Sequence, residues 1–170
     1  MILEILKRGK ARPLSRRRNQ YDVVIEYLIA RSDGEIFVHI IDKRHLHGDE
    51  FHGGALGKKY YSLSSLAPYI KLMPDVSQRP GTSETLKAAL PRNNNTSGAI
   101  VAVLRAEGVL MSSPPSEENY SYSPLGPVSG CRSWSNPDYS IDDFLREMVE
   151  MDTLDVVEVP ESKIWCSPRY

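Results

Sequence analysis

The sequence predicts an α+β fold. A small mixed sheet is built on an antiparallel hairpin at residues 21–42 and is joined by short helices, a basic N-terminal arm and an acidic C-terminal helix. The hairpin is predicted by two runs of β-branched and aromatic residues, because Asp33-Gly34 between them suits a two-residue turn. Apolar residues at helical spacing after Ser140 predict the acidic helix. The length of 170 residues, 41% of them hydrophobic and 25% charged, fits one globular core.

Changes in composition divide the chain into four parts. We expect a basic arm at 1–20, an α+β core at 21–111, a linker rich in Ser and Pro at 112–139, and an acidic helix–strand segment at 140–170. The linker has too few apolar residues to offset the entropy cost of ordering, so we expect it to be extended or disordered. The last segment can pack back on the core.

The turn fixes the register of the hairpin. If Asp33 and Gly34 form the turn, Ser32 lies opposite Glu35 and every later pair follows. One face of the hairpin is then apolar and is predicted to be core: Val23, Ile25, Tyr27, Ile29, Ile36, Val38 and Ile40. The opposite face mixes polar and apolar side chains and therefore needs partial cover.

Three short elements are predicted in the middle of the chain. A helix is expected at about 66–73, and a second one runs from Thr82 or Ser83 to Leu90. The apolar run at 99–104 has the length of a strand and no alternation, which predicts a strand buried on both faces.

The C-terminal part has the clearest local signals. Ser140 and Asp143 form a capping box at the start of a helix, and the apolar positions that follow have helical spacing. Residues 153–159 then predict a strand, which Pro160 ends.

Charge is unevenly distributed along the chain. Residues 1–20 carry seven cations against one acid, whereas residues 141–161 carry eight acids against one cation. The candidate anion-binding residues are those of the arm: Lys7, Arg8, Lys10, Arg12, Arg16, Arg17 and Arg18. Clustered cations bind phosphates, so we expect a polyanionic partner, either RNA or DNA or anionic lipid head groups. The acidic helix at 140–152 is expected to bind a protein partner or the arm of another copy.

These features favour a non-enzymatic structural or assembly protein. It would bind nucleic acid or an anionic membrane face through the arm and would self-associate or bind a partner. In layout, the chain resembles matrix and nucleocapsid-associated proteins of enveloped RNA viruses. We expect an intracellular location, in the cytoplasm, in the nucleus or at a membrane face, or a place in a virion if the chain is viral.

The alternative is a metal-dependent hydrolase or nuclease. His45, His47, His52 and Asp49 lie in a glycine-rich stretch that is predicted to be a loop. The run from His45 to Asp49 resembles the first part of the H-x-H-x-D-H motif of metallo-β-lactamase-fold hydrolases, with Glu50 in place of the last histidine.

Several other classes lack their signals. No apolar run approaches the roughly 18 residues of a membrane-spanning helix. The sequence has no G-x-S-x-G motif for a serine nucleophile and no phosphate-binding glycine loop. We therefore predict no cofactor and no covalent catalysis.

Overall fold

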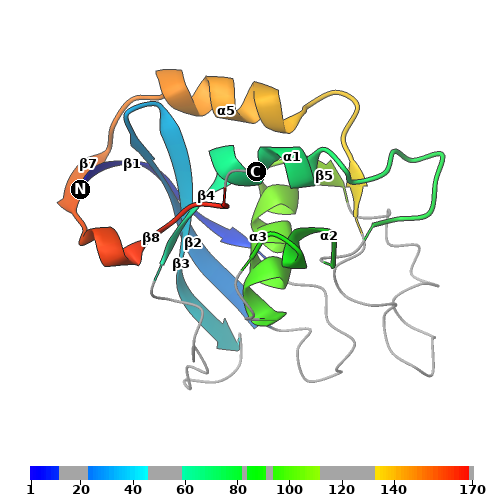
Figure 1. The fold of residues 1–170 in the computed structure, drawn as a ribbon, viewed down its shortest axis with the longest axis horizontal. Coiled ribbons are helices and arrows are strands. Elements are labelled where there is room, and N and C mark those ends of the chain that lie inside the picture. The colour runs from blue at the N-terminus through cyan, green and yellow to red at the C-terminus, as the bar shows by residue number, and fades with distance from the viewer. Residues whose placement is uncertain (12–22, 46–58, 82–83, 91–93, 112–132, 169–170) are drawn as a thin grey trace.

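The computed structural model describes residues 1–11, 23–45, 59–81, 84–90, 94–111 and 133–168. Its larger sheet contains β1 (Ile2–Ala11), β2 (Val23–Ser32), β3 (Glu35–His45), β4 (Tyr60–Ser62), β7 (Asp155–Glu158) and β8 (Ile164–Trp165). A second sheet pairs β5 (Leu110–Met111) with β6 (Trp134–Ser135). The helices are α1 (Leu63–Ile70), α2 (Glu84–Lys87), α3 (Asn94–Ala106) and α5 (Ile141–Glu150), with a 3₁₀ turn, η3 (Glu161–Lys163), before β8. The predicted α+β class is confirmed (Figure 1).

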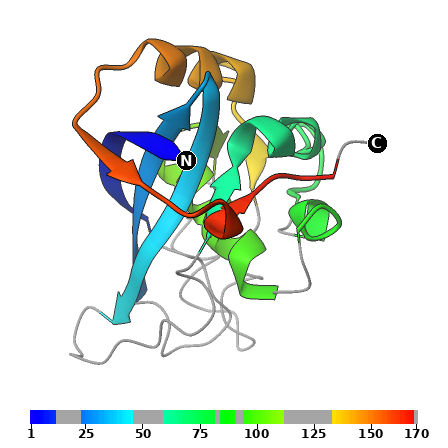
Figure 2. The ribbon, with the colours of Figure 1, turned by 60° about the vertical axis from the view of Figure 1, so that its left-hand side comes forward.

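The larger sheet is curled and mostly antiparallel. Its strand order is β7-β1-β2-β3-β4-β8, and only the β4–β8 pair is parallel. Strands β7 and β8 are close in sequence but pair with opposite edges, β7 with β1 and β8 with β4. The segment between them therefore crosses the sheet, as Figure 2 shows in orange and red.

The predicted hairpin is confirmed, and its predicted register holds from Ser32/Glu35 to Tyr27/Ile40; beyond that point a bulge shifts the pairs by one residue. Asp33 and Gly34 have φ angles of 48° and 77°, the left-handed region that a type I′ turn requires at both positions. Ser32 pairs with Glu35, and a bulge follows at Glu26/Tyr27. Because the turn selects the register, six of the predicted core residues lie in the main core: Ile25, Tyr27, Ile29, Ile36, Val38 and Ile40. The side chain of Val23 lies outside the described part of the chain.

Apolar residues occupy both faces of the sheet. One face packs against α1, α2, α3 and α5 and forms the main core. The other face forms a smaller cluster, whose buried members are Leu3, Ile5, Leu28, Ala30, Phe37, Tyr60 and Val159. Val159 and the partly buried Ile164 come from the crossing segment, which supplies the partial cover that the mixed face needs.

The predicted N-terminal arm is wrong for residues 2–11. They form β1, which lies inside the sheet between β7 and β2. A bulge between Ile5 and Lys7 lets Leu3 and Ile5 enter the smaller cluster while Leu6 enters the main core. Burial of apolar residues on both faces stabilises the strand despite the cations that follow. Residues 12–20 lie outside the described residues.

The predicted strand at 99–104 is also wrong, because these residues belong to α3. All six side chains are buried, so this part of the helix is apolar all round and its sequence shows no polar stripe. Gly108, at a φ of 82°, ends the helix in the left-handed conformation typical of a helix C-terminus. The amide of Val109 donates to the Leu104 carbonyl and completes this end.

The domain boundaries also need correction. The core extends beyond 21–111, since residues of β1 and α5 are buried in it. Of the predicted linker, 112–132 lies outside the described residues. Residues 133–139 are ordered, because Ser133 pairs with Gly81 and β6 pairs with β5.

Other predicted elements are present with shifted bounds. The helix expected at about 66–73 is α1, which starts earlier because the Ser62 hydroxyl caps it by accepting from the Ser65 amide. The second short helix is reduced to α2. The capping box of α5 and the strand β7 are confirmed.

Candidate functional site

The described cations of the predicted arm lie on β1 and point to two different faces of the sheet. Arg8 is paired with Leu28 and Lys10 with Glu26, so both project on the side of the smaller apolar cluster. Arg8 and Lys10 are exposed. Lys7 is paired with Ile29 and projects on the side of the main core.

Lys7 is held by an internal ion pair. Its ammonium group lies 2.6 Å from Oε2 of Glu107, whose side chain is only 6% exposed. The other carboxylate oxygen of Glu107 accepts a 2.6 Å hydrogen bond from the Tyr27 hydroxyl. Burial, followed by this hydrogen bond and the charge of Glu107, raises the pKa of Tyr27. Lys7 therefore has an internal partner, Glu107, and does not belong to the proposed anion-binding surface.

Gly9 explains how Tyr27 reaches this ion pair. A Cβ at position 9 would lie 2.5 Å from the ring of Tyr27, so the ring packs directly over the backbone of β1. No other residue leaves this space open. In the sequence, Gly9 lies between two cations. Its lack of a side chain leaves the space that the Tyr27 ring occupies.

We call the side of the sheet that carries the smaller apolar cluster the outer side. On this side, paired residues run from Arg8 on β1 to Tyr60 on β4. Leu28 is opposite His39, and His39 is opposite Tyr60. The His39 and Tyr60 rings stack with centroids 4.2 Å apart, and Nδ1 of His39 is 3.0 Å from the Lys59 carbonyl oxygen. The imidazole is thus fixed from two sides.

Two cations act electrostatically on this stack. Burial raises the pKa of Tyr60, and the positive charge of Arg8 opposes that rise. Burial also lowers the pKa of His39, the Lys59 carbonyl opposes this shift, and the charge of Lys163 adds to it. The fold therefore favours the neutral form of the His39 imidazole. Arg8 and Lys10 project on the same side of β1, and Lys163 acts on His39 on this side of the sheet. We call the surface formed by these three cations the outer basic face.

The backbone places further cations at the same end of the sheet. Ala11 pairs with Ile25, which pairs with Lys43, and Arg44 follows on β3. The chain after Ala11 contains Arg12, Arg16, Arg17 and Arg18, which lie outside the described residues.

The chain matches no family model, no curated protein and no solved structure.

The acidic helix α5 lies on the other side of the sheet. Ile141, Phe144 and Met148 are buried in the main core, and the acids face outward. Asp142 pairs with Lys71 at 2.9 Å, with both side chains about half exposed. Hydrogen bonds from the amide and hydroxyl of Ser140 lower the pKa of Asp143. Acidic groups are therefore presented on a fixed helix.

The histidine cluster is not tested by the structure. His47, Asp49 and His52 lie outside the described residues, as does the side chain of His45. In the described part of the chain, no group of three or more His, Cys, Asp or Glu is placed to hold a metal ion. The same part contains no helix that is long and apolar enough to cross a membrane. The hydrolase alternative remains a prediction.

The sequence analysis named Arg8 and Lys10 but missed Lys163 and did not recognise that Arg8 and Lys10 share one face of a strand. The spacing of Arg8 and Lys10, two residues apart, is the signal that both project to one side of a strand. It becomes readable only when residues 2–11 are recognised as a strand. Lys163 is more than 150 residues away in sequence from Arg8, and no local pattern could have joined them.

Proposed function

We propose that this protein is a non-enzymatic structural or assembly protein that binds a phosphate-bearing polyanion, nucleic acid or an anionic membrane face, through the outer basic face. The observation that carries the proposal is the position of Arg8 and Lys10. They are exposed neighbours on one side of β1, at the strand end that leads into Arg12 and Arg16–Arg18.

A fixed pair of cations on a strand is a favourable start for phosphate binding. The pairing of β1 with β2 and β7 sets the backbone, so little ordering entropy is lost from the backbone when the anion binds. Each phosphate contact releases condensed counterions, which makes binding steeply dependent on salt. Both nucleic acids and anionic lipid surfaces present closely spaced phosphates, so they share this chemistry.

Self-association is the second part of the proposal. The outward acids of α5, Asp142, Glu147 and Glu150, are exposed and of opposite charge to the outer basic face. Complementary charge steers encounter and sets orientation. We propose that α5 of one copy contacts the basic face of another copy, or a basic partner protein.

The test of the first part uses paired charge substitutions. Arg8→Gln with Lys10→Gln should lower affinity for RNA, duplex DNA or vesicles containing phosphatidylserine by at least tenfold in 50 mM salt. On duplex DNA, the salt slope should fall by about 0.9 for each lost contact. The matched control, Arg79→Gln with Arg146→Gln, removes two exposed cations elsewhere. Comparing the three ligands distinguishes nucleic acid from membrane, and equal loss in variant and control would refute the proposal.

The test of the second part leaves the packing of α5 intact. Asp142→Asn, Glu147→Gln and Glu150→Gln remove three exposed charges, and the buried stripe of the helix is unchanged. Light scattering at low salt should show that oligomers of the wild type are lost in this variant. Oligomers that persist unchanged would exclude the acidic face from self-association.

A further inference from the structure

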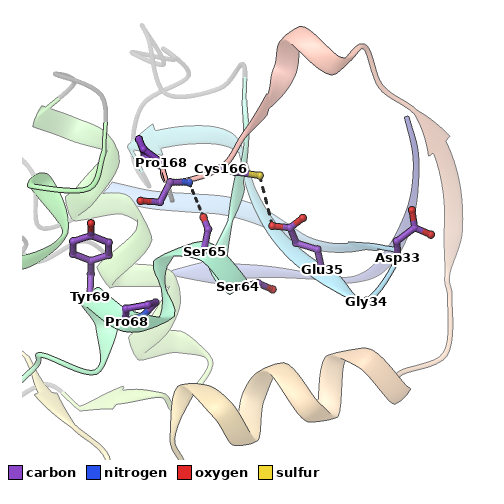
Figure 3. A pocket seen from close by; sticks show the side chains of 10 residues that line it. Asp33, Gly34, Glu35, Ser64, Ser65, Pro68, Tyr69, Cys166 and Pro168 are labelled. Atoms are coloured by element: carbon purple, nitrogen blue, oxygen red, sulfur yellow. Dashed lines mark hydrogen bonds between the residues drawn. The ribbon is translucent and has the colours of Figure 1, made fainter. Parts of the chain in front are cut away.

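A cleft of about 830 Å³ opens beside the β2–β3 turn, where three segments from distant parts of the sequence meet. These segments are residues 33–35 at the turn, residues 64–69 of α1, and residues 166–168. The cleft is lined by Asp33, Gly34, Glu35, Ser64, Ser65, Pro68, Tyr69, Cys166, Ser167 and Pro168 (Figure 3). Its walls differ in chemistry from one end to the other.

One end of the cleft is acidic. The Asp33 carboxylate is exposed at the turn, and Glu35 follows two residues later. Oε1 of Glu35 accepts a 2.6 Å hydrogen bond from the Ser62 hydroxyl and lies 3.6 Å from the Cys166 thiol, which donates to it. The carboxylate is thus held in place at the mouth of the cleft.

The other end is apolar. Figure 3 shows Pro68, Tyr69 and Pro168 on the side of the cleft away from Glu35 and Asp33, with the serines between the two ends. Two proline rings and a tyrosine ring offer flat, rigid surfaces that lose little entropy when a ligand packs on them.

The floor between the ends is fixed by hydrogen bonds. The Ser65 hydroxyl accepts a 2.8 Å bond from the Ser167 amide, and the Ser64 hydroxyl accepts a 3.0 Å bond from the Ile36 amide. These bonds join α1 to the C-terminal segment and to β3. The cleft is therefore preformed rather than dependent on a loop rearrangement.

Ser167 belongs to the wall of the cleft and is only 6% exposed. Its hydroxyl is itself buried and has no hydrogen-bond partner among the described residues. A buried hydroxyl without a partner is unfavourable, and such groups are uncommon in folded proteins.

We propose that the cleft binds the side chain of an arginine or lysine in a peptide segment of a partner protein. Long basic side chains carry an apolar stem and a charged head, which match the two ends of the cleft. The stem packs on Pro68, Tyr69 and Pro168, and the cation meets the carboxylates of Glu35 and Asp33. This proposal is independent of the outer basic face, since the cleft lies elsewhere and selects the opposite charge.

Cys166 provides a direct readout because its thiol is exposed and lines the cleft. The chain has two cysteines, so the Cys131→Ser variant leaves a single thiol to follow. The probe is the peptide acetyl-Ala-Arg-Ala-amide, and its neutral control has norleucine at the central position. We expect the arginine peptide to slow alkylation of Cys166 at least threefold, saturably, and the norleucine peptide to have no effect.

Glu35→Gln tests the charge without removing the structural hydrogen bond. The glutamine oxygen can still accept from the Ser62 hydroxyl, so the melting temperature should remain within about 2 °C of the wild type. Protection by the arginine peptide, measured as the ratio of rates with and without peptide, should be lost. The control Glu161→Gln removes an exposed acid elsewhere and should keep full protection.

Three results would overturn the proposal. The arginine peptide could fail to protect Cys166, the norleucine peptide could protect it equally, or Glu35→Gln could retain protection. Binding of RNA or vesicles by the outer basic face is measured separately, so the two proposals fail independently.

Discussion

Arg31 connects more parts of this fold than any sequence pattern suggests, and its replacement should be strongly destabilising. It lies next to the hairpin turn at the end of β2, and its side chain is 13% exposed. The guanidinium group donates to the carboxylate of Glu4 at 2.9 Å and to Thr153 at 3.1 Å. It also donates to three carbonyl oxygens at the C-terminal end of α5, those of Met148, Val149 and Met151, at 2.8–2.9 Å.

The size of the expected destabilisation follows from the hydrogen bonds that these carbonyl oxygens would lose. The last carbonyls of a helix have no partner within the helix, so Arg31 supplies what a C-cap would otherwise provide. Hydrogen bonds that involve a charged group contribute about 1.5–3 kcal/mol each, but several bonds from one side chain are not additive, and solvent reaches part of this group. We therefore expect Arg31→Met to lower the free energy of unfolding by about 2–4 kcal/mol.

Urea denaturation followed by circular dichroism measures this change. Arg31→Lys keeps the charge but replaces a planar fork with a single ammonium group, so it should recover only part of the loss. Arg146→Met is the matched control, because Arg146 is exposed on α5 and makes only a 3.1 Å surface ion pair with Asp143. The control should stay within about 0.5 kcal/mol of the wild type. An Arg31→Met variant equally close to the wild type would show that Arg31 does not hold α5 to the sheet.

Three further predictions concern local structure. Gly34→Val places a β-branched residue at a φ of 77° and should lower stability by about 1 kcal/mol or more, visible as a lower urea midpoint. Gly9→Ala brings a methyl group to 2.5 Å from the Tyr27 ring and should cost about 1–3 kcal/mol, again by urea denaturation, with the tyrosine displaced. The pKa of Asp143 is lowered in the fold, so its stabilising contribution is present above pH 3.8 and is lost as the pH falls from 3.8 through the lowered pKa. In acid titrations, Asp143→Asn should therefore lose less stability than the wild type as the pH is lowered below 3.8.

The elements that the sequence predicts correctly are those whose signals are local. Asp33-Gly34 encodes two positive φ angles, and the register of β2 and β3 follows from them. Ser140 and Asp143 encode the reciprocal hydrogen bonds of a capping box, which are present at 3.0 and 3.1 Å. In both cases, the residues that determine the local structure lie next to one another or within one helical turn in the sequence.

The failures have tertiary causes. Residues 99–104 contain no polar residue to mark a period, and only burial within the core distinguishes a helix from a strand there. Residues 2–11 combine apolar and basic residues, and their strand forms because β7, from the other end of the chain, covers one edge while β2 covers the other. The same is true of the candidate site, where pairing with β2 places Lys7 on the side of the main core, against Glu107, and Arg8 on the opposite side.

The positions of the charges favour contact between copies over contact within one molecule. Helix α5 lies over the end of the sheet with the β2–β3 turn, and β3 ends on the opposite side (Figure 1). Glu4 is joined to the α5 end through Arg31, whereas Lys10 is six residues further along β1, a distance of about 20 Å in a strand. Because its apolar stripe is buried and Arg31 holds its C-terminal end, α5 cannot cover Lys10 without leaving the core.

A second copy faces no such restriction. If α5 of one copy contacts the outer basic face of the next, the contact is head-to-tail and extends into a chain of molecules unless its rotation closes a ring. In such a chain α5 occupies the basic face of each neighbour and competes with the polyanion for it, so raising the concentration of RNA or anionic vesicles should dissociate the low-salt oligomers.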